Sequence, residues 1–176
     1  MKILHVGCGR VKLPEWFKGY EEIRLDLDPE ANPDILGGMD DIPLPDESVN
    51  AIYTSHTLEH VYYNDAIKTL REFLRVLSPS GMAMVIVPDV KSIAQRILDD
   101  DMYGSVYEVG GISVSAADML YGHQGLMEGS EPGREFRFCH KFGYTPKTLG
   151  AALATAGFSG VKSISDGFNA IAVGIK

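Results

Sequence analysis

Glycines and a carboxylate that follow two apolar segments are the first candidates for ligand binding in this 176-residue sequence. Gly7, Cys8 and Gly9 follow the apolar run of residues 3–6, and Asp26 ends a second apolar segment. Small residues after a strand let a ligand approach the backbone, whose amides can meet a carboxylate or a phosphate. A carboxylate at the end of the next strand can accept hydrogen bonds from both hydroxyls of a ribose. A tight turn without a ligand stays an alternative for the glycines.

Apolar segments that alternate with helical patterns predict the elements that position these residues. We expect strands at residues 3–6, 23–27, 34–36, 49–54, 82–87, 161–165 and 169–175. We expect about two helical turns from Pro14 and helices over 64–77, 92–98 and 146–156. The last two strands are close enough in sequence to form an antiparallel hairpin. The expected fold is α/β: a doubly wound, mostly parallel, seven-stranded sheet with a C-terminal antiparallel strand.

Residues 1–176 are expected to form one domain, with an insertion at about 99–144 that serves as a lid or a substrate-binding element. The net charge of −8 argues against a nucleic-acid partner, because phosphate contacts need clustered lysines and arginines. The two cysteines form no CxxC pair, and we expect no metal site. No apolar run approaches the roughly 20 residues that span a bilayer, and no signal segment opens the chain. We therefore expect no membrane association and a cytoplasmic location.

The glycine segment departs from the fingerprint of dinucleotide-binding proteins at one position. That fingerprint has a third glycine where the following helix opens, and Lys12 stands there in this sequence. A helix that begins at a lysine cannot pack as closely on a pyrophosphate. A ligand that lacks a pyrophosphate therefore fits better than a nicotinamide dinucleotide.

An ordered set of motifs resembles class I S-adenosylmethionine-dependent methyltransferases, and small methyltransferases of type 11 in particular. The motifs are HVGCG at 5–9, LDLDP at 25–29, DIPLPDESVN at 41–50, LEHV at 58–61, LRVLSPSG at 74–81 and AGF at 156–158. The resemblance covers residues 2–98 and 145–176 and implies a Rossmann-like sheet. It also implies S-adenosylmethionine as the cofactor and methyl transfer to a small-molecule or glycan acceptor that the sequence does not identify.

The resemblance also implies which residues bind the cofactor. Gly7 and Gly9 would border its methionine part, Asp26 would hold its ribose, and Met39 and Asp40 would flank its adenine. The full implied set is Gly7, Cys8, Gly9, Asp26, Leu27, Met39, Asp40, Ser55 and His56. Ser55 and His56 would face the methionine end and the acceptor.

The sequence departs from the family pattern in two respects. Gly38 stands where the family often has an acidic residue, so the adenine contact would have to come from Asp40. The helix between the first two strands is shorter than in the family, and the family's helices before the first strand have no counterpart here. A sheet face left uncovered in this way could be closed by a second subunit, and we therefore expect a homodimer.

Methyl transfer needs a base only where the acceptor must lose a proton. His56, expected at the carboxyl end of a strand, is the first candidate, and a hydrogen bond to loop backbone is its alternative. His140 is the second candidate, with Tyr144 beside it in an acceptor pocket under the insertion. Glu59 and His60 are expected to be structural.

Further residues of the insertion could serve the same acceptor pocket. Tyr121 and His123 could line it, and Arg134 and Arg137 could bind an anionic group. Packing of the insertion on the domain is the alternative for its aromatic residues.

Two other functions stay open at this point. One is a methyltransferase-like domain that binds a nucleoside or a protein without catalysis, which the short early helix and Gly38 favour. The other is a nicotinamide-dependent oxidoreductase, which Lys12 disfavours.

Overall fold

The fold is an α/β sandwich around one seven-stranded sheet, seen in a computed structural model that describes residues 1–109, 111–129 and 137–176. The strands of this sheet lie in the order β3-β2-β1-β4-β5-β9-β8. Their bounds are β1 (Lys2–Val6), β2 (Glu21–Asp26), β3 (Ile35–Leu36), β4 (Val49–Ser55), β5 (Leu77–Pro88), β8 (Ser159–Asp166) and β9 (Asn169–Ile175). The pairs among β1 to β5 are parallel, and β9 is antiparallel to both of its neighbours. The expected doubly wound sheet with a C-terminal antiparallel strand is thereby confirmed.

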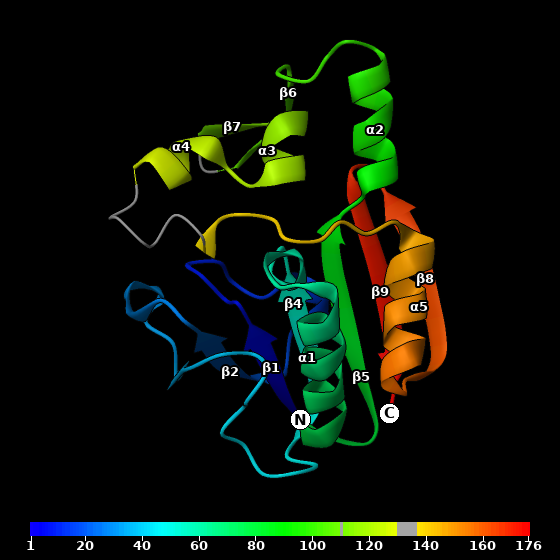
Figure 1. Ribbon diagram of the computed structural model, residues 1–176. Coiled ribbons are helices and arrows are strands. Elements are labelled where there is room, and N and C mark those ends of the chain that lie inside the picture. Colours follow the sequence, from blue (N-terminus) through cyan, green and yellow to red (C-terminus); the bar gives the residue numbers. More distant parts are fainter. Residues whose placement is uncertain (110, 130–136) are drawn as a thin grey trace.

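Two long helices, α1 (Tyr63–Val76) and α5 (Pro146–Ala156), cover one face of the sheet side by side (Figure 1). The sequence forms α5 where Thr145 caps the helix by accepting a hydrogen bond from the Thr148 amide and Pro146 opens the first turn. Their apolar stripes bury Leu70, Phe73 and Leu149 completely against the central strands. Each such side chain stabilises the fold by about 1.5–3 kcal/mol.

The opposite face of the sheet is covered only in part. Between β1 and β2 the chain forms a single 3-10 turn, η1 (Glu15–Phe17), in place of the two helical turns expected from Pro14. That expectation was wrong because β2 already begins at Glu21, which leaves no room for a second turn. Phe17 is buried on this face, whereas Trp16 stays 67% exposed.

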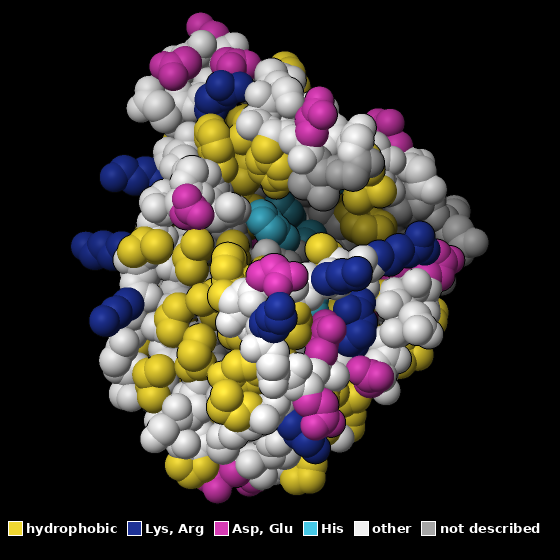
Figure 2. Space-filling view, turned by 180° about the vertical axis from the view of Figure 1, so that it is seen from behind, with side chains coloured by type: hydrophobic (Ala, Val, Ile, Leu, Met, Phe, Trp, Pro, Cys, Tyr) yellow, Lys and Arg dark blue, Asp and Glu magenta, His cyan; other side chains and the backbone are white. Residues whose placement is uncertain are grey.

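An open apolar surface remains beside η1, over β5, β9 and β8. Figure 2 shows hydrophobic side chains gathered over part of this side of the molecule. The residues that line the groove there are Trp16, Met84, Ile86, Lys162, Ile164, Ile171 and Val173. The early helix that would shield such a face is absent among the described residues, as the short spacer between the first two strands predicts.

The segment between β5 and α5 lies beyond the carboxyl ends of the strands (Figure 1). It contains α2 (Val90–Leu98), the hairpin β6 (Ser105–Val109) and β7 (Ile112–Ser115), α3 (Ala116–Tyr121) and α4 (Gln124–Glu128). Its described part is more regular than the sequence suggested, and Ile93, Ala116 and Met119 give it a small core of its own. Arg134, one of the expected anion contacts, lies outside the described residues. No helix of the described chain is long and apolar enough to cross a bilayer.

Candidate active site

The loop after β1 is shaped by Gly7, which no other residue can replace without a rearrangement. Its φ is +64°, in the left-handed region that side chains disfavour. A Cβ at this position would collide with the side chain of Thr57, which follows β4. The amide of Gly7 donates to the Leu25 carbonyl at 2.9 Å, so the loop turns across the end of β2. The first strand, the second strand and the loop after β4 therefore meet at this glycine.

Asp26 closes the same corner from the end of β2. Its carboxylate accepts hydrogen bonds from the amides of Gly9 at 2.7 Å and Asp28 at 2.9 Å. An ionised carboxylate has about four acceptor positions, so two remain for a ligand. A Cβ built on Gly9 would meet only Val11, at 3.8 Å, which leaves the space above this glycine open.

Arg24 holds the glycine loop from the other side and was not foreseen from the sequence. Its guanidinium donates to the carbonyls of Gly9 at 2.6 Å and Val11 at 3.0 Å. Three backbone groups of the loop are thus bonded to side chains of β2. The signal available in the sequence was the alternation along β2, which places Arg24 and Asp26 on the same face.

The other residues implied as cofactor contacts lie around this corner with differing exposure. Cys8 is fully buried, Leu27 is 58% exposed and Ser55 ends β4 half-buried. Met39 packs partly against the main core. Asp40 is exposed and forms an ion pair with Lys68 at 3.1 Å. None of these observations tests a contact with the cofactor, and the implied roles stay predictions.

His56 and Glu59 form a pair at the carboxyl end of β4. The backbone of His56 has a φ of +53° and its amide donates to the Ile86 carbonyl at 2.9 Å, which fixes the residue between β4 and β5. Its Nδ1 lies 3.6 Å from Glu59 Oε1, and its side chain is 38% exposed. Burial favours a lower pKa for His56, but the interaction with Glu59 outweighs it and raises this pKa above its ordinary value. A histidine oriented by a carboxylate is suited to take a proton from an acceptor.

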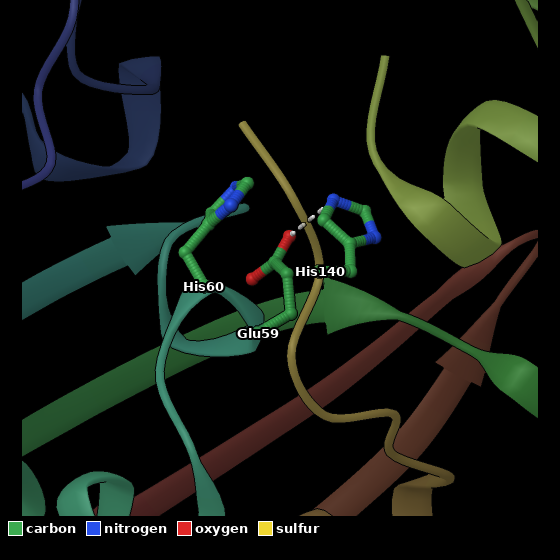
Figure 3. Close-up of side chains that lie close together, drawn as sticks. All are labelled: Glu59, His60 and His140. Carbon is green, nitrogen blue, oxygen red and sulfur yellow. Dashed lines mark ion pairs between the residues drawn. The ribbon is translucent and has the colours of Figure 1, made fainter. Parts of the chain in front are cut away.

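Glu59 sits at the centre of a larger polar cluster than the sequence predicted. It belongs to the turn η3 (Leu58–His60), and its side chain is only 2% exposed. His140 Nε2 lies 3.9 Å from its Oε1, and Figure 3 shows the carboxylate between the rings of His60 and His140. Burial disfavours the charged form of Glu59, but His56 and then His60 and His140 hold its pKa below the ordinary value.

Two tyrosines complete the surroundings of this carboxylate. Burial, and then the charge of Glu59, raises the pKa of both Tyr107 on β6 and Tyr144. Tyr144 is fully buried, and its hydroxyl has no hydrogen-bond partner among the described residues. The charge of Glu59 therefore acts on a side chain of the insertion and on one that directly precedes α5.

Backbone hydrogen bonds join the segment of residues 139–142 to η3. The amide of Lys141 donates to the Glu59 carbonyl at 2.8 Å, and His60 Nδ1 lies 3.1 Å from the Cys139 carbonyl. Nothing local in the sequence encodes this contact, because 79 residues separate His60 from Cys139. Glu59, expected to be structural, is thus a neighbour of both candidate bases, and the ring of His60 lies 4.8 Å from that of His140.

The remaining residues suggested for an acceptor pocket are more peripheral. Tyr121 is 55% exposed, and Arg137 is exposed. His123 caps α4, where its Nδ1 accepts a hydrogen bond from the Leu126 amide at 3.2 Å. Asp28 accepts a hydrogen bond from the Glu30 amide at 3.0 Å and caps the 3-10 turn η2 (Pro29–Ala31).

The strand order, the glycine loop and the acidic end of β2 define a Rossmann-like fold of the class I methyltransferase type. Solved structures of three methyltransferases share this fold with the chain. One from Archaeoglobus fulgidus has a TM-score of 0.63 and 15% identity, over 99% of this chain and 86% of the other. One from Aquifex aeolicus has a TM-score of 0.58 and 16% identity, over 99% of this chain and 81% of the other. One from Mesorhizobium loti has a TM-score of 0.59 and 18% identity, over 99% of this chain and 90% of the other. At such identities the likeness shows a common fold.

Residues 4–85 match the family model described as a methyltransferase domain. No curated protein is significantly similar to the chain. The family model and the shared fold confirm the resemblance to class I S-adenosylmethionine-dependent methyltransferases. They also support S-adenosylmethionine as the cofactor.

Proposed function

We propose that this protein transfers a methyl group from S-adenosylmethionine to a hydroxyl or amine of a small molecule or glycan. The observation that carries the proposal is that the Gly7–Gly9 loop, bonded to Asp26, lies against Thr57, which directly follows His56 of the His56–Glu59 pair. In open α/β sheets, ligands bind outside the carboxyl ends of the strands, at the switch in strand order. Here β1 and β4 lie at that switch.

The residues at this edge fit the cofactor. The open space above Gly9 leaves the loop backbone accessible, and Asp26 retains acceptor positions for ribose hydroxyls. Gly7 and Gly9 would border the methionine part of the cofactor, and Met39 and Asp40 its adenine. When bound, S-adenosylmethionine supplies an electrophilic methyl group, so the protein's task is mainly alignment.

His56 is the residue that we propose as the base for a hydroxyl acceptor. Its imidazole is partly exposed at the strand end, and Glu59 orients it and stabilises its protonated form. His140 faces the same carboxylate from the other side and is the second candidate. Burial lowers the pKa of His140, which keeps its ring neutral near pH 7.

We also propose that residues 99–144 act as the lid of an acceptor pocket within one domain of residues 1–176. Figure 2 shows histidine side chains at the floor of a hollow on the molecule's surface. The approach of His140 to the Glu59 carboxylate and the hydrogen bond from the Lys141 amide to the Glu59 carbonyl support a role for this segment in acceptor binding. A homodimer and a cytoplasmic location stay predictions, and sedimentation velocity would test the first.

Thermal denaturation with added ligand tests the proposed function. S-adenosylmethionine and S-adenosylhomocysteine at 100 times their dissociation constants should each stabilise the protein by about 2.7 kcal/mol. For a chain of this size, that corresponds to a rise in Tm of roughly 5–10 °C. NAD should cause no shift, and a shift with NAD alone would contradict the proposal.

An assay of methyl transfer distinguishes an enzyme from a domain that only binds the cofactor. Label should pass from methyl-labelled S-adenosylmethionine to a member of a mixture of small hydroxyl and amine acceptors or glycans. Cofactor binding without transfer to any acceptor would favour the non-catalytic domain that stays the alternative.

A further inference from the structure

Glu59 presents a buried carboxylate that lacks hydrogen-bond partners. The residue is 1% exposed, and neither carboxylate oxygen has a hydrogen-bond partner within the described ranges. The nearest imidazole nitrogens, His56 Nδ1 and His140 Nε2, lie 3.6 and 3.9 Å from Oε1. A buried carboxylate whose partners stay beyond hydrogen-bond distance is only partly compensated for its loss of hydration. The site therefore calls for a cation at contact distance.

The two imidazoles beside this carboxylate are held in the form that binds metals. His60 Nδ1 lies 3.1 Å from the Cys139 carbonyl, and His140 Nδ1 lies 2.8 Å from the Met119 carbonyl. A carbonyl oxygen only accepts hydrogen bonds, so the Nδ1 of each ring carries the proton. The Nε2 of a neutral ring then offers its lone pair. This arrangement, in which the other ring nitrogen donates to a backbone carbonyl, is typical of histidines that bind metals.

The spacing of the three side chains suits one ion. One ligand atom from each of Glu59, His60 and His140 lies within 4.8 Å of the others (Figure 3). In tetrahedral coordination, ligand atoms at about 2.1 Å from one ion lie roughly 3.4 Å apart. Glu59 Oε1 and His140 Nε2, which lie 3.9 Å apart, would need to close by about half an ångström. A pair at the full 4.8 Å would need to close by roughly 1.4 Å, which side-chain rotation can supply.

We propose that Glu59, His60 and His140 form a binding site for one divalent transition-metal ion. Two imidazole nitrogens and one carboxylate oxygen favour Zn²⁺ or a similar ion over Mg²⁺ and Ca²⁺, which prefer oxygen ligands. Three protein ligands leave coordination positions open, next to His56. The role of the ion rests on the proposed function: in an open position it would bind an acceptor oxygen and lower the pKa of its hydroxyl.

Zn²⁺ titration of the protein alone tests the site. The full chain, without a polyhistidine tag, is stripped with a chelator, and Zn²⁺ binding is then measured by calorimetry. We expect one Zn²⁺ per chain, and binding at least 10-fold weaker in Glu59→Gln, His60→Ala and His140→Ala. His123→Asn is the matched control, because it changes a histidine outside the cluster and retains a capping side chain; its binding should be unaltered.

Two results would overturn the site: no equimolar Zn²⁺ uptake, or unaltered uptake in both His60→Ala and His140→Ala. X-ray absorption at the zinc edge of the unaltered protein keeps the test valid where a variant fails to fold. It should show two imidazole nitrogens at about 2.0–2.1 Å, and a shell without imidazole would contradict the site. Binding of S-adenosylhomocysteine, measured separately, distinguishes failure of the metal site from failure of the proposed function.

Discussion

The carboxylate of Asp26 accepts a hydrogen bond of 2.7 Å from the backbone amide of Gly9. This contact joins the end of β2 to the loop after β1, the two places where the sequence suggested ligand binding. Asp26 therefore has two tasks in our account: it holds the loop, and it offers its remaining acceptor positions to a ribose.

Gly7→Ala should lower the free energy of unfolding by about 2–4 kcal/mol. The left-handed backbone costs about 1–2 kcal/mol for alanine, and displacement of Thr57 adds to it. Urea denaturation measures the change. Gly167→Ala is the matched control, because Gly167 has a φ of +61° and a new Cβ there would meet nothing within 4 Å. This variant should lose only the part of the unfolding free energy that comes from backbone strain. Equal losses in the two variants would show that the contact with Thr57 is unimportant.

Arg24→Met should weaken the binding of S-adenosylhomocysteine by roughly 3- to 10-fold. The variant loses two hydrogen bonds to carbonyls of the glycine loop, each of about 1 kcal/mol or more, so the loop is less well ordered before binding. Calorimetric titration measures the affinity. Arg10→Ala removes an exposed arginine of the same loop, paired with Glu30 at 2.8 Å, and should have almost no effect. An Arg24 variant with full affinity would contradict this role.

Asp89→Ala should destabilise the junction between β5 and the insertion by about 2–4 kcal/mol. Asp89 is 1% exposed and accepts hydrogen bonds from the Lys91 amide and from the hydroxyls of Ser92 and Ser165. Its removal takes away the N-cap of α2 and the acceptor of two serine hydroxyls. Ser165→Ala removes one of these bonds and should cost about 1 kcal/mol. Equilibrium unfolding in urea compares the two, and a smaller loss for Asp89→Ala than for Ser165→Ala would refute the argument.

Much of the fold could be predicted because local patterns encode it. The helix over 64–77 followed from the spacing of Ile67, Leu70 and Phe73, and the structure begins α1 one residue earlier. Thr145 and Pro146 marked the start of α5, and Gly157 its end. The hairpin of β6 and β7 was missed because its strands are short and lie in a segment without strong apolar periodicity.

The candidate site could be predicted only where it lies at strand ends. Asp26 and His56 follow buried strands, so their places at one edge followed from the fold. The approach of His140 to Glu59 could not be predicted, because it depends on how a long insertion folds back onto η3. The expectation that the chain holds no metal site considered cysteines and local spacing, and neither reports on histidines brought together by tertiary structure.

His56→Ala should reduce methyl transfer to a hydroxyl acceptor by roughly 10²- to 10⁴-fold, as expected for loss of a general base. Affinity for S-adenosylhomocysteine should fall far less, because Asp26 and the glycine loop stay intact. Single-turnover rates and calorimetric affinities give the two values. A His56→Ala enzyme with an unaltered rate would exclude this histidine as the base.

Calorimetric titration of Asp26→Asn with S-adenosylhomocysteine tests the central claim most directly. Asparagine keeps an acceptor for the loop amides but loses the charge that favours hydrogen bonds from ribose hydroxyls. We predict at least 10-fold weaker binding with a Tm within a few degrees of the unaltered protein, and near-normal binding for the matched variant Asp28→Asn. Binding by Asp26→Asn as tight as that of the unaltered protein would contradict the assignment of this carboxylate to the cofactor.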